Sequence, residues 1–540
     1  MKKYIYLLSL LGLFSVSSCS LDAFPEGGIV SEDQRDDISE KDPNKLIVFA
    51  KGISANYVKF DALEENGSFH SDYGYAAVCQ ILDMSGQDYM APLMGYNWFS
   101  STMLFRDRTL NSSASEIMWR LYYNVIKSSN DVLRVIAPLE ETGETQYDKE
   151  LFRMYIAQGY TNRAFAYFQL AQTYQFTYVG NENKPAVPLI LLENDERNVS
   201  GRATLQQVYD VIVDDLQKAV DLLKGNREVK VPDKSFVDLG VVYGVFAKVM
   251  LVMNKWEEAA KYARLAIESS NAAPYSIEEL KKPALNTASA SSWMWANLIT
   301  EENDIVKTGI INWPSHLCSF TGNGYTTAGA FRSVNSNLWN KISESDIRKH
   351  SWWVDGEMKA PYTDNIDVKG EPLAEYLGFD PYTNIKFGPY QNIMLNTINA
   401  SDWPMMRIEE MYFIEAEALG MTSLPQGKKA LEDFMNAYRY PNADYRAEVS
   451  SSEELQDEIW LQRRIEFWGE GLAFFDLKRL KKPVVRIVDG KTSYPKDARF
   501  VIPADDPIML WLIPQKEIEA NVNLSQADNN AIGNTPKPQS

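Results

Sequence analysis

Two neighbouring segments of the chain carry large and small residues at the spacing of an α-helix face. The first segment has large, large, small and large side chains and the second has three alanines: Tyr243, Phe246, Ala247 and Met250, then Ala259, Ala263 and Ala266. Residues three or four positions apart lie on the same face of a helix. Alanines let two helices approach closely, while the large side chains fill the groove between them. The pattern therefore predicts a closely packed helix pair.

The same seven positions match the pattern of a tetratricopeptide repeat, and other segments predict further helix pairs. A long amphipathic helix is expected over 153–174. Its partner begins at Thr204, where Thr204 and Gln207 form a capping box. More helices are predicted over 44–60, 113–139, 405–419, 428–438 and 453–468, of which 405–419 and 428–438 form a pair. The predicted fold class is mainly α.

Two segments lack a helical or strand period and are rich in aromatic residues. The first, 67–109, is predicted to be a loop because it is rich in Gly, Ser, Tyr and Met. The second, about 272–402, separates helical pairs at about 150–271 and 403–480. Structureless loops of this length are unusual in a compact domain, so we expect an irregular lobe packed onto the helices. Residues 44–540 are then predicted to form a single domain.

The N-terminal nineteen residues are typical of an export signal. Met1-Lys2-Lys3 is basic, 4–16 is almost wholly apolar, and Ser17-Ser18-Cys19 supplies small residues and a cysteine. The apolar run is shorter than the roughly 20 residues of a membrane-spanning helix. The cysteine at the cut resembles a bacterial lipoprotein box. This implies a signal peptide over 1–18, a lipid on Cys19 and a tether over 19–43; an ordinary secretory signal is the alternative.

The net charge and the numbers of cysteines and histidines restrict which partners and cofactors the protein is expected to have. A formal net charge of −19 argues against nucleic acid as a partner. The two cysteines beyond the leader, Cys79 and Cys318, are expected to be buried free thiols. His70, His316 and His350 are far apart in sequence and form no short-spaced metal pair. We therefore expect no cofactor, although oxygen-rich loops leave a structural Ca²⁺ open.

Two C-terminal segments carry motifs in a characteristic order. One runs from Gln462 to Gly471 (QRRIEFWGEG) into FFDLKR, and the other is IPQKEIEAN, from Ile513 to Asn521. Both resemble signatures of the SusD/RagB family, the nutrient-binding surface lipoproteins of Bacteroidetes. The segments 405–419 and 163–174 are similar to two further family segments, so the resemblance covers essentially the whole mature chain.

The sequence departs from the family pattern at two places. Leu472-Ala473 stands where the family often has a His-Arg-like pair, and Gln462 replaces a common acidic residue. We interpret both as structural variation. Arg463, Arg464, Glu466, Glu470 and Asp476 have the residue types of a catalytic site, but a satisfied ion-pair network that ties the last helix to the body is the favoured interpretation.

The resemblance implies a non-catalytic binder of a glycan or oligosaccharide. Members of the family are anchored by a lipid in the outer membrane, are exposed at the cell surface, and deliver ligand to a SusC-like TonB-dependent transporter. The implied fold has about four tetratricopeptide-like helix pairs, with the ligand site on the irregular lobe. A peptide-binding lipoprotein is the alternative. A pure assembly module and a glycoside hydrolase, which needs two carboxylates roughly 5 to 9.5 Å apart, are the other rivals.

Aromatic rings in irregular segments are the candidate ligand contacts. Sugars present apolar C–H faces, which stack on exposed rings, and hydroxyls, which polar side chains orient. The candidate rings are Trp98 and Tyr96 in the first loop and Trp293, Trp295 and Tyr325 in the lobe; the candidate polar partners are Asp72, Asn97 and Asn323. Trp98 is the first choice, because family ligand sites use this loop. Loop packing is the alternative role for each ring.

Overall fold

The computed structural model describes residues 43–192, 200–282, 285–354 and 379–540 of the chain. The predicted signal peptide, Cys19 and the tether lie outside these residues. The chain divides into two units, Met1–Leu46 and Ile47–Ser540. The described part of the first unit is a 3₁₀ turn at Pro43–Leu46. All further description concerns the second unit.

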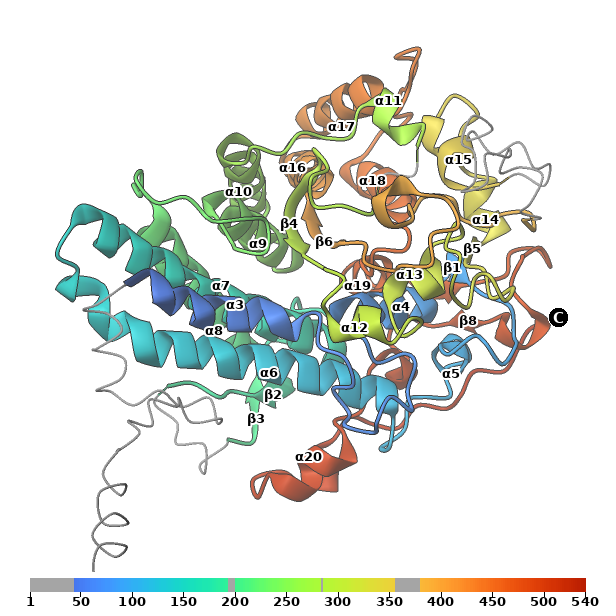
Figure 1. Cartoon of the computed structure of the whole chain (residues 1–540). Coiled ribbons are helices and arrows are strands. Elements are labelled where there is room, and N and C mark those ends of the chain that lie inside the picture. The colour runs from blue at the N-terminus through green and yellow to red at the C-terminus, as the bar shows by residue number, and fades with distance from the viewer. Residues whose placement is uncertain (1–42, 193–199, 283–284, 355–378) are drawn as a thin grey trace, which may run out of the picture. The chain divides into compact units, whose positions relative to one another are not determined.

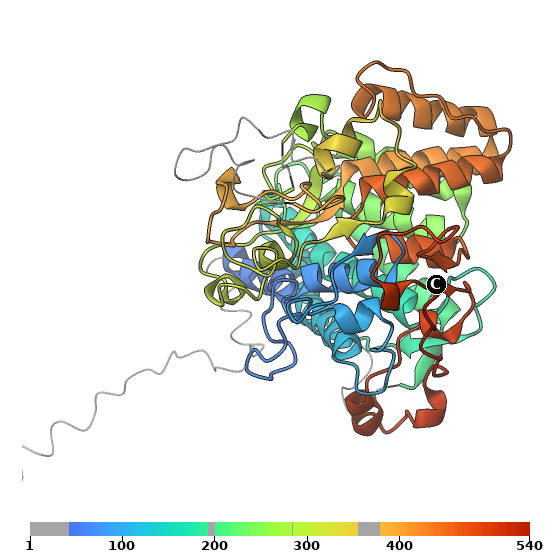
Figure 2. The same ribbon diagram turned by 90° about the vertical axis from the view of Figure 1, so that its right-hand side faces the viewer.

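The second unit is mainly α-helical, as predicted, and successive helices pack on one another (Figure 1). In the N-terminal half, α3 packs against α6 and α7, and α7 packs between α6 and α8. Then α9 packs on α10, α10 on α16, and α16 on α17 and α18. Figure 2 shows α16, α17 and α18 lying side by side. The bounds are α3 Ile47–Asn56, α6 Ser113–Ile136, α7 Gln146–Tyr174, α8 Leu205–Leu223, α9 Leu239–Val252, α10 Trp256–Ser269, α16 Ile408–Thr422, α17 Leu424–Tyr438, α18 Ser452–Glu466 and α19 Ala473–Arg479.

The helix starts follow from side-chain capping. The capping box predicted at Thr204 and Gln207 is present and opens α8. A second box, made by Thr145 and Asp148, opens α7, eight residues or so before the predicted start at 153. These caps satisfy backbone N–H groups that have no partner within the helix.

The helix pair predicted from the alanine pattern is α9 with α10. Ala259, Ala263 and Ala266 are all fully buried, which lets the two helices approach closely. Phe246 on α9 lies flat against Tyr262 on α10, with ring centroids 4.0 Å apart. The small and large residues of the pattern therefore pack between the two helices, as predicted.

The segment 67–109, predicted to be a loop, contains a helix that was missed. It holds α4 (Tyr75–Ser85), β1 (Tyr89–Met90) and α5 (Ser100–Met103). Every residue of α4 is buried. A helix buried on all sides has no polar face, so the period that identifies an amphipathic helix is absent from its sequence.

The described residues of the segment 272–402 are largely irregular, as predicted, but contain short helices and strands. Its helices are α11 Ile277–Leu280, α12 Asp304–Lys307, α13 Trp313–Leu317, α14 Ser336–Trp339 and α15 Ile347–Trp352. The described strands form antiparallel two-stranded ladders: β1 with β5 (Ser333–Val334), β2 (Pro185–Pro188) with β3 (Arg202–Thr204), β4 (Trp293–Asn297) with β6 (Trp403–Arg407), and β7 (Val484–Val485) with β8 (Val501–Ile502). The last described α-helix is α20, Gln515–Ala520.

The helix predicted to begin at residue 405 begins later. Residues Trp403–Arg407 form β6, and α16 starts at Ile408. The strand forms because β4, more than a hundred residues earlier, pairs with it, and Trp293 faces Arg407 across the ladder. Local sequence carries no information about such a partner.

Candidate functional site

Four aromatic side chains from three segments meet at the surface of the lobe and are called the ring cluster here: His70, Tyr96, Trp98 and Tyr325. The Trp98 indole stacks on the His70 imidazole, with centroids 4.4 Å apart and planes 17° from parallel. Tyr325 lies 6.3 Å from Trp98 and 6.1 Å from Tyr96, centroid to centroid. Tyr96 is 52% exposed and Trp98 36% exposed, so two rings of the cluster face solvent.

Both exposed rings lie on the loop between β1 and α5, where successive side chains are alternately exposed and buried. Tyr96 and Trp98 point outward, while Asn97 and Phe99 are buried. The Asn97 side chain donates a hydrogen bond to the Pro92 carbonyl oxygen (3.2 Å) and accepts one from the Phe99 backbone N–H (3.2 Å). Asn97 therefore holds the loop in shape, and its amide is not turned toward a ligand.

Tyr325 and His70 support the exposed rings from below. The Tyr325 hydroxyl is hydrogen-bonded to His70 Nδ1. Tyr325 is only 6% exposed. Burial lowers the pKa of His70 below its ordinary value of 6.5 and raises the pKa of Tyr325 above 10.0, so both rings are neutral near pH 7.

Two predicted polar partners are engaged by the protein itself. Asp72 is fully buried and accepts a hydrogen bond from the Leu63 backbone N–H at 2.8 Å. Burial raises the pKa of its carboxyl to about 6. The Asn323 amide donates to the Gly309 carbonyl oxygen at 3.3 Å, and this residue is partly exposed. Of the two, Asn323 alone retains a surface that a ligand can reach.

Trp293 and Trp295 lie in the core, contrary to the expectation of rings offered by an irregular segment. Both belong to β4, and their exposed fractions are 0% and 1%. Trp295 packs edge-on against Phe165 of α7, with centroids 5.1 Å apart. The error came from the lack of any visible period, because β4 is buried on both faces and does not alternate.

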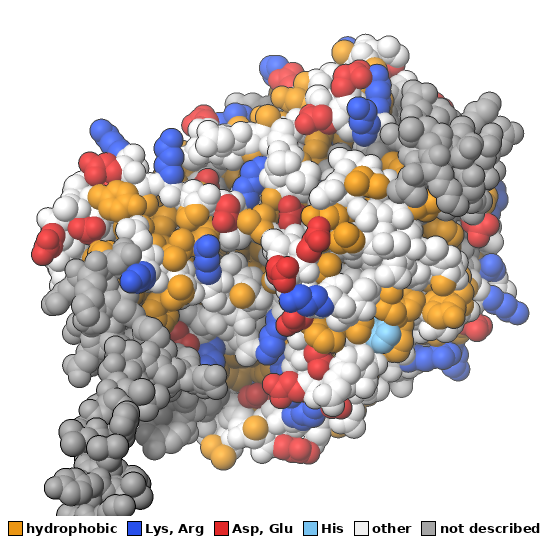
Figure 3. Space-filling model, in the orientation of Figure 1, with side chains coloured by type: hydrophobic (Ala, Val, Ile, Leu, Met, Phe, Trp, Pro, Cys, Tyr) orange, Lys and Arg blue, Asp and Glu red, His pale blue; other side chains and the backbone are white. Residues whose placement is uncertain are grey.

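Two histidines of this region were missed by sequence reasoning. His70 belongs to the ring cluster, and His316 lies directly behind it, with its ring centroid 4.6 Å from that of Tyr325. Their spacing indicates no metal pair, and the two are too far apart in sequence for any local signal to join them. Figure 3 shows a histidine among hydrophobic side chains in the region where Figure 1 places α5 and α13.

The charged residues of the C-terminal motif form the predicted ion-pair network. Glu466, fully buried, accepts hydrogen bonds from Arg439 at 2.8 Å and from Arg407 at 3.1 Å. The other pairs are Arg348 with Glu466, Glu470 with Lys386 and Arg407, Arg464 with Asp88, and Asp476 with Arg463 and Arg479. These pairs connect the segment from α18 to α19 to five residues elsewhere in the chain: Asp88, Arg348, Lys386, Arg407 and Arg439.

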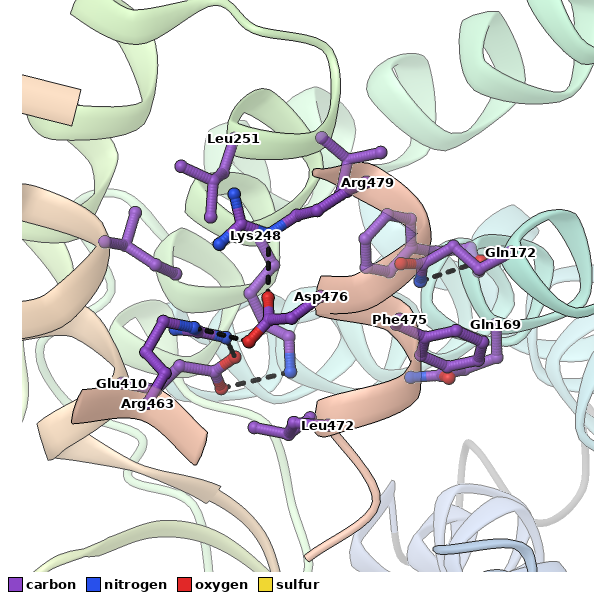
Figure 4. A pocket seen from close by; sticks show the side chains of 13 residues that line it. Gln169, Gln172, Lys248, Leu251, Glu410, Arg463, Leu472, Phe475, Asp476 and Arg479 are labelled. Carbon is purple, nitrogen blue, oxygen red and sulfur yellow. Dashed lines mark hydrogen bonds and ion pairs between the residues drawn. The ribbon is translucent and has the colours of Figure 1, made fainter. Parts of the chain in front are cut away.

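One small cavity borders this network (Figure 4). Lys248 and Arg463 both approach Glu410, and Arg463 also bonds Asp476 at 2.7 Å. The volume is about 30 Å³, which suits one or two waters and excludes a sugar ring. The charged residues around this cavity therefore form a packed, charge-paired interior.

Larger hollows lie elsewhere. A groove of about 470 Å³ is bounded by α10, α16 and α17, and one of about 780 Å³ is bounded by β2, β3 and the segment after α20. Neither is lined by Tyr96 or Trp98. Both rings are exposed to solvent.

Three further findings concern the cysteines, metal binding and membrane-spanning helices. Cys79 and Cys318 are buried free thiols, as predicted. Over the described parts of the chain, no set of three or more His, Cys, Asp or Glu side chains is arranged to hold a metal ion. The helices in those parts are all too short or too polar to cross a membrane.

Comparison with known proteins places these features in a family. Residues 80–251 match a family described as "Starch-binding associating with outer membrane", and residues 337–530 match the SusD family. Together the two matches span more than half of the chain. The SusD-like protein P38 of Formosa agariphila is 23% identical over 463 residues, covering 77% of this chain and 81% of that protein.

Solved structures show the same fold. A SusD-like carbohydrate binding protein from Bacteroides vulgatus superposes with a TM-score of 0.71 at 21% identity, covering 91% of this chain and 98% of the other. A SusD superfamily protein from Bacteroides thetaiotaomicron gives a TM-score of 0.69 at 20% identity, covering 91% and 99%. The motif order, the two family matches and the shared fold agree, and the chain belongs to the SusD family.

Proposed function

We propose that this protein binds a glycan or oligosaccharide without cleaving it, and that the ring cluster is the contact surface. The observation that carries the proposal is the pair of outward-facing rings, Tyr96 and Trp98, held on a braced loop. Support comes from the family, whose matched description names starch binding, and from a relative of the same fold described as a carbohydrate binding protein.

The chemistry of the surface fits a sugar chain. The flat face of Trp98 offers an apolar platform for the C–H face of a pyranose, and its ordering cost is small because His70 already fixes the ring. The hydroxyl of the exposed Tyr96, and the partly exposed Asn323, two residues before Tyr325 in the chain, can supply hydrogen bonds to sugar hydroxyls.

The proposal extends to location and partner. A lipid on Cys19 would hold the protein at the outer membrane, facing the cell exterior, and the family description supports an outer-membrane association. Bound glycan would pass to a SusC-like TonB-dependent transporter. No cofactor is proposed for binding.

The test is calorimetric titration with a panel that contains maltoheptaose, other neutral and acidic oligosaccharides, and peptides. Trp98→Ala is expected to weaken binding of the best ligand about 10- to 100-fold, because one well-stacked aromatic ring contributes of order 1 to 3 kcal/mol. The matched control is Tyr147→Ala, which removes an aromatic that is 41% exposed on α7, away from the ring cluster. Equal affinity of Trp98→Ala and the unaltered protein would remove Trp98 from the site.

The same panel separates the rivals. Binding of peptides alone would favour the peptide-binding alternative. Sustained release of reducing ends from a glycan would show a hydrolase and overturn the non-catalytic assignment. Retention of a transporter partner without any small ligand would favour an assembly module.

A further inference from the structure

His316 is the residue that connects all the segments of the ring cluster, although it is itself fully buried. It lies on α13 and its ring touches an aromatic residue from each segment. Its centroid is 5.2 Å from that of Tyr73, near His70 in the chain, and 5.4 Å from that of Phe99, next to Trp98. It is 4.6 Å from that of Tyr325. A movement of this one ring would therefore be felt by every segment that supplies the cluster.

A hydrogen bond also links the His316 ring to the backbone of His70. His316 Nε2 lies 2.9 Å from the backbone carbonyl oxygen of His70. A carbonyl oxygen only accepts, so Nε2 must carry the proton. The bond fixes the backbone of His70, and the His70 side chain in turn stacks on Trp98 and bonds the Tyr325 hydroxyl. His316 thus acts on the exposed rings through His70.

The surroundings keep His316 in this single state. Burial, and then the positive charge of Arg332, lower the pKa of His316 well below its ordinary value of 6.5. A neutral ring with its proton on Nε2 has a lone pair on Nδ1, and Nδ1 is buried without a hydrogen-bond partner among the described residues. The donor role of His316 is therefore maintained across the neutral and mildly acidic range.

We propose that His316 is a positioning residue of the ring cluster: it fixes His70, and through His70 it sets Trp98, braced by the buried Tyr325, in the orientation that a bound glycan contacts. The ligand half of this inference rests on the proposed function. The positioning half is a property of the free protein and can be measured without any ligand.

The ligand-free experiment uses histidine NMR. The chain has three histidines, so protein labelled with ¹³C at histidine Cε1 gives three signals, which single substitutions assign. Because His70 stacks on Trp98, its Cε1–H signal is expected at an upfield-shifted position that Trp98→Leu abolishes. His316→Phe keeps a planar ring but loses the donor, and is expected to abolish the same shift. His316→Gln restores an N–H donor and is expected to recover it.

The ligand experiment runs in parallel with the best oligosaccharide of the panel, with maltoheptaose as the first probe. We expect His316→Phe to weaken binding about 5- to 10-fold, the effect of losing one hydrogen bond, and His316→Gln to stay within about 3-fold of the unaltered protein. The control is Ser319→Ala, which deletes a buried hydrogen bond to the Asn384 carbonyl oxygen (2.5 Å) in the same lobe. It should change stability while leaving affinity and the His70 signal unchanged.

Each outcome decides the matter. A folded His316→Phe variant with an unchanged His70 signal overturns the proposal. If His316→Phe does not fold, His316→Leu, which also lacks the donor, takes its place: loss of the His70 shift supports positioning, and a folded variant with an unchanged shift overturns it. If no glycan binds the unaltered protein, the proposed function fails while the NMR result still stands.

Discussion

Glu466 shows how single buried charges hold the C-terminal motif together. Its carboxylate is fully buried and lies within 3.0 Å of Arg348, 3.1 Å of Arg407 and 2.8 Å of Arg439. Burial by itself would raise the pKa of Glu466, but the arginines outweigh it and hold that pKa well below its ordinary value of 4.5. The residue is therefore structural. Its loss would remove one carboxylate shared by three buried arginines, each of which keeps another acidic partner.

Replacing this carboxylate should be costly. Glu466→Gln is expected to reduce the free energy of unfolding by about 3 to 5 kcal/mol, as for a buried ion pair that loses one partner. Urea denaturation measures it. Asp433→Asn, in the exposed Lys429–Asp433 pair of α17, is the control, with an expected change below about 0.5 kcal/mol.

The difference in stability between the unaltered protein and Glu466→Gln is expected to depend on pH. Because the folded-state pKa of Glu466 is depressed, its stabilisation is fully present above about pH 4.5 and is lost as the pH falls through the folded value. The stability gap between the unaltered protein and Glu466→Gln should thus narrow in acid. A gap that stayed constant down to the acid transition would contradict the assigned charge state.

At the scale of elements, the close approach of α16 and α17 depends on a glycine in each helix, Gly420 and Gly427. A Cβ added to Gly427 would lie 2.3 Å from the Gly420 Cα and 2.6 Å from the Ala416 carbonyl oxygen. These neighbours are backbone atoms, which cannot move aside as a side chain can. The close approach of the two helices therefore requires glycine there, although glycine is a poor helix former.

This geometry predicts opposite effects for the same substitution in two helices. Gly427→Ala should destabilise the protein by about 1 to 3 kcal/mol through overpacking. Gly52→Ala on α3, where an added Cβ meets nothing within 4 Å, should be neutral or stabilise by up to about 1 kcal/mol from helix propensity. Thermal unfolding of both variants measures the contrast, and a stabilised Gly427→Ala would show that the helices can separate without cost.

At the scale of the whole molecule, contacts between distant parts of the chain hold the second unit together. Arg464 of α18 pairs with Asp88 at 2.6 Å, and the Gly471 backbone N–H donates to Asp83 of α4 at 2.8 Å. A Cβ on Gly471 would lie 2.7 Å from Cys79, so the turn before α19 presses directly on α4. The family motif of the C-terminal region and the helix missed by sequence analysis are thus one packed unit.

The proposed lipid anchor makes a prediction for the location of the whole protein. Cys19→Ser removes the thiol to which the lipid would be attached, so the protein is expected to move from the membrane fraction to the soluble fraction. Fractionation and labelled fatty-acid incorporation measure this. Ser20→Ala is the control and should remain membrane-bound; unaltered fractionation of Cys19→Ser would contradict the anchor.

Sequence reasoning reached the exposed part of the candidate site but not its support. Trp98 and Tyr96 were recognisable because large rings in a Gly- and Ser-rich segment are unusual. His70 and His316 are 246 positions apart, and only folding brings the imidazole of one against the carbonyl of the other. Trp293 looked equivalent to Trp98 in sequence, yet pairing of β4 with β6 buries it.

By itself, the sequence determined the helix pairs, the capping box at Thr204 and the pairing role of the C-terminal charges, because these depend on periods and spacings within one segment. The tertiary structure alone decided which rings face solvent, that α4 is a helix, and that a buried histidine lies behind the ring cluster. Burial is a property of all the neighbours of a residue at once. Most of those neighbours are distant in the chain, so no local pattern can record it.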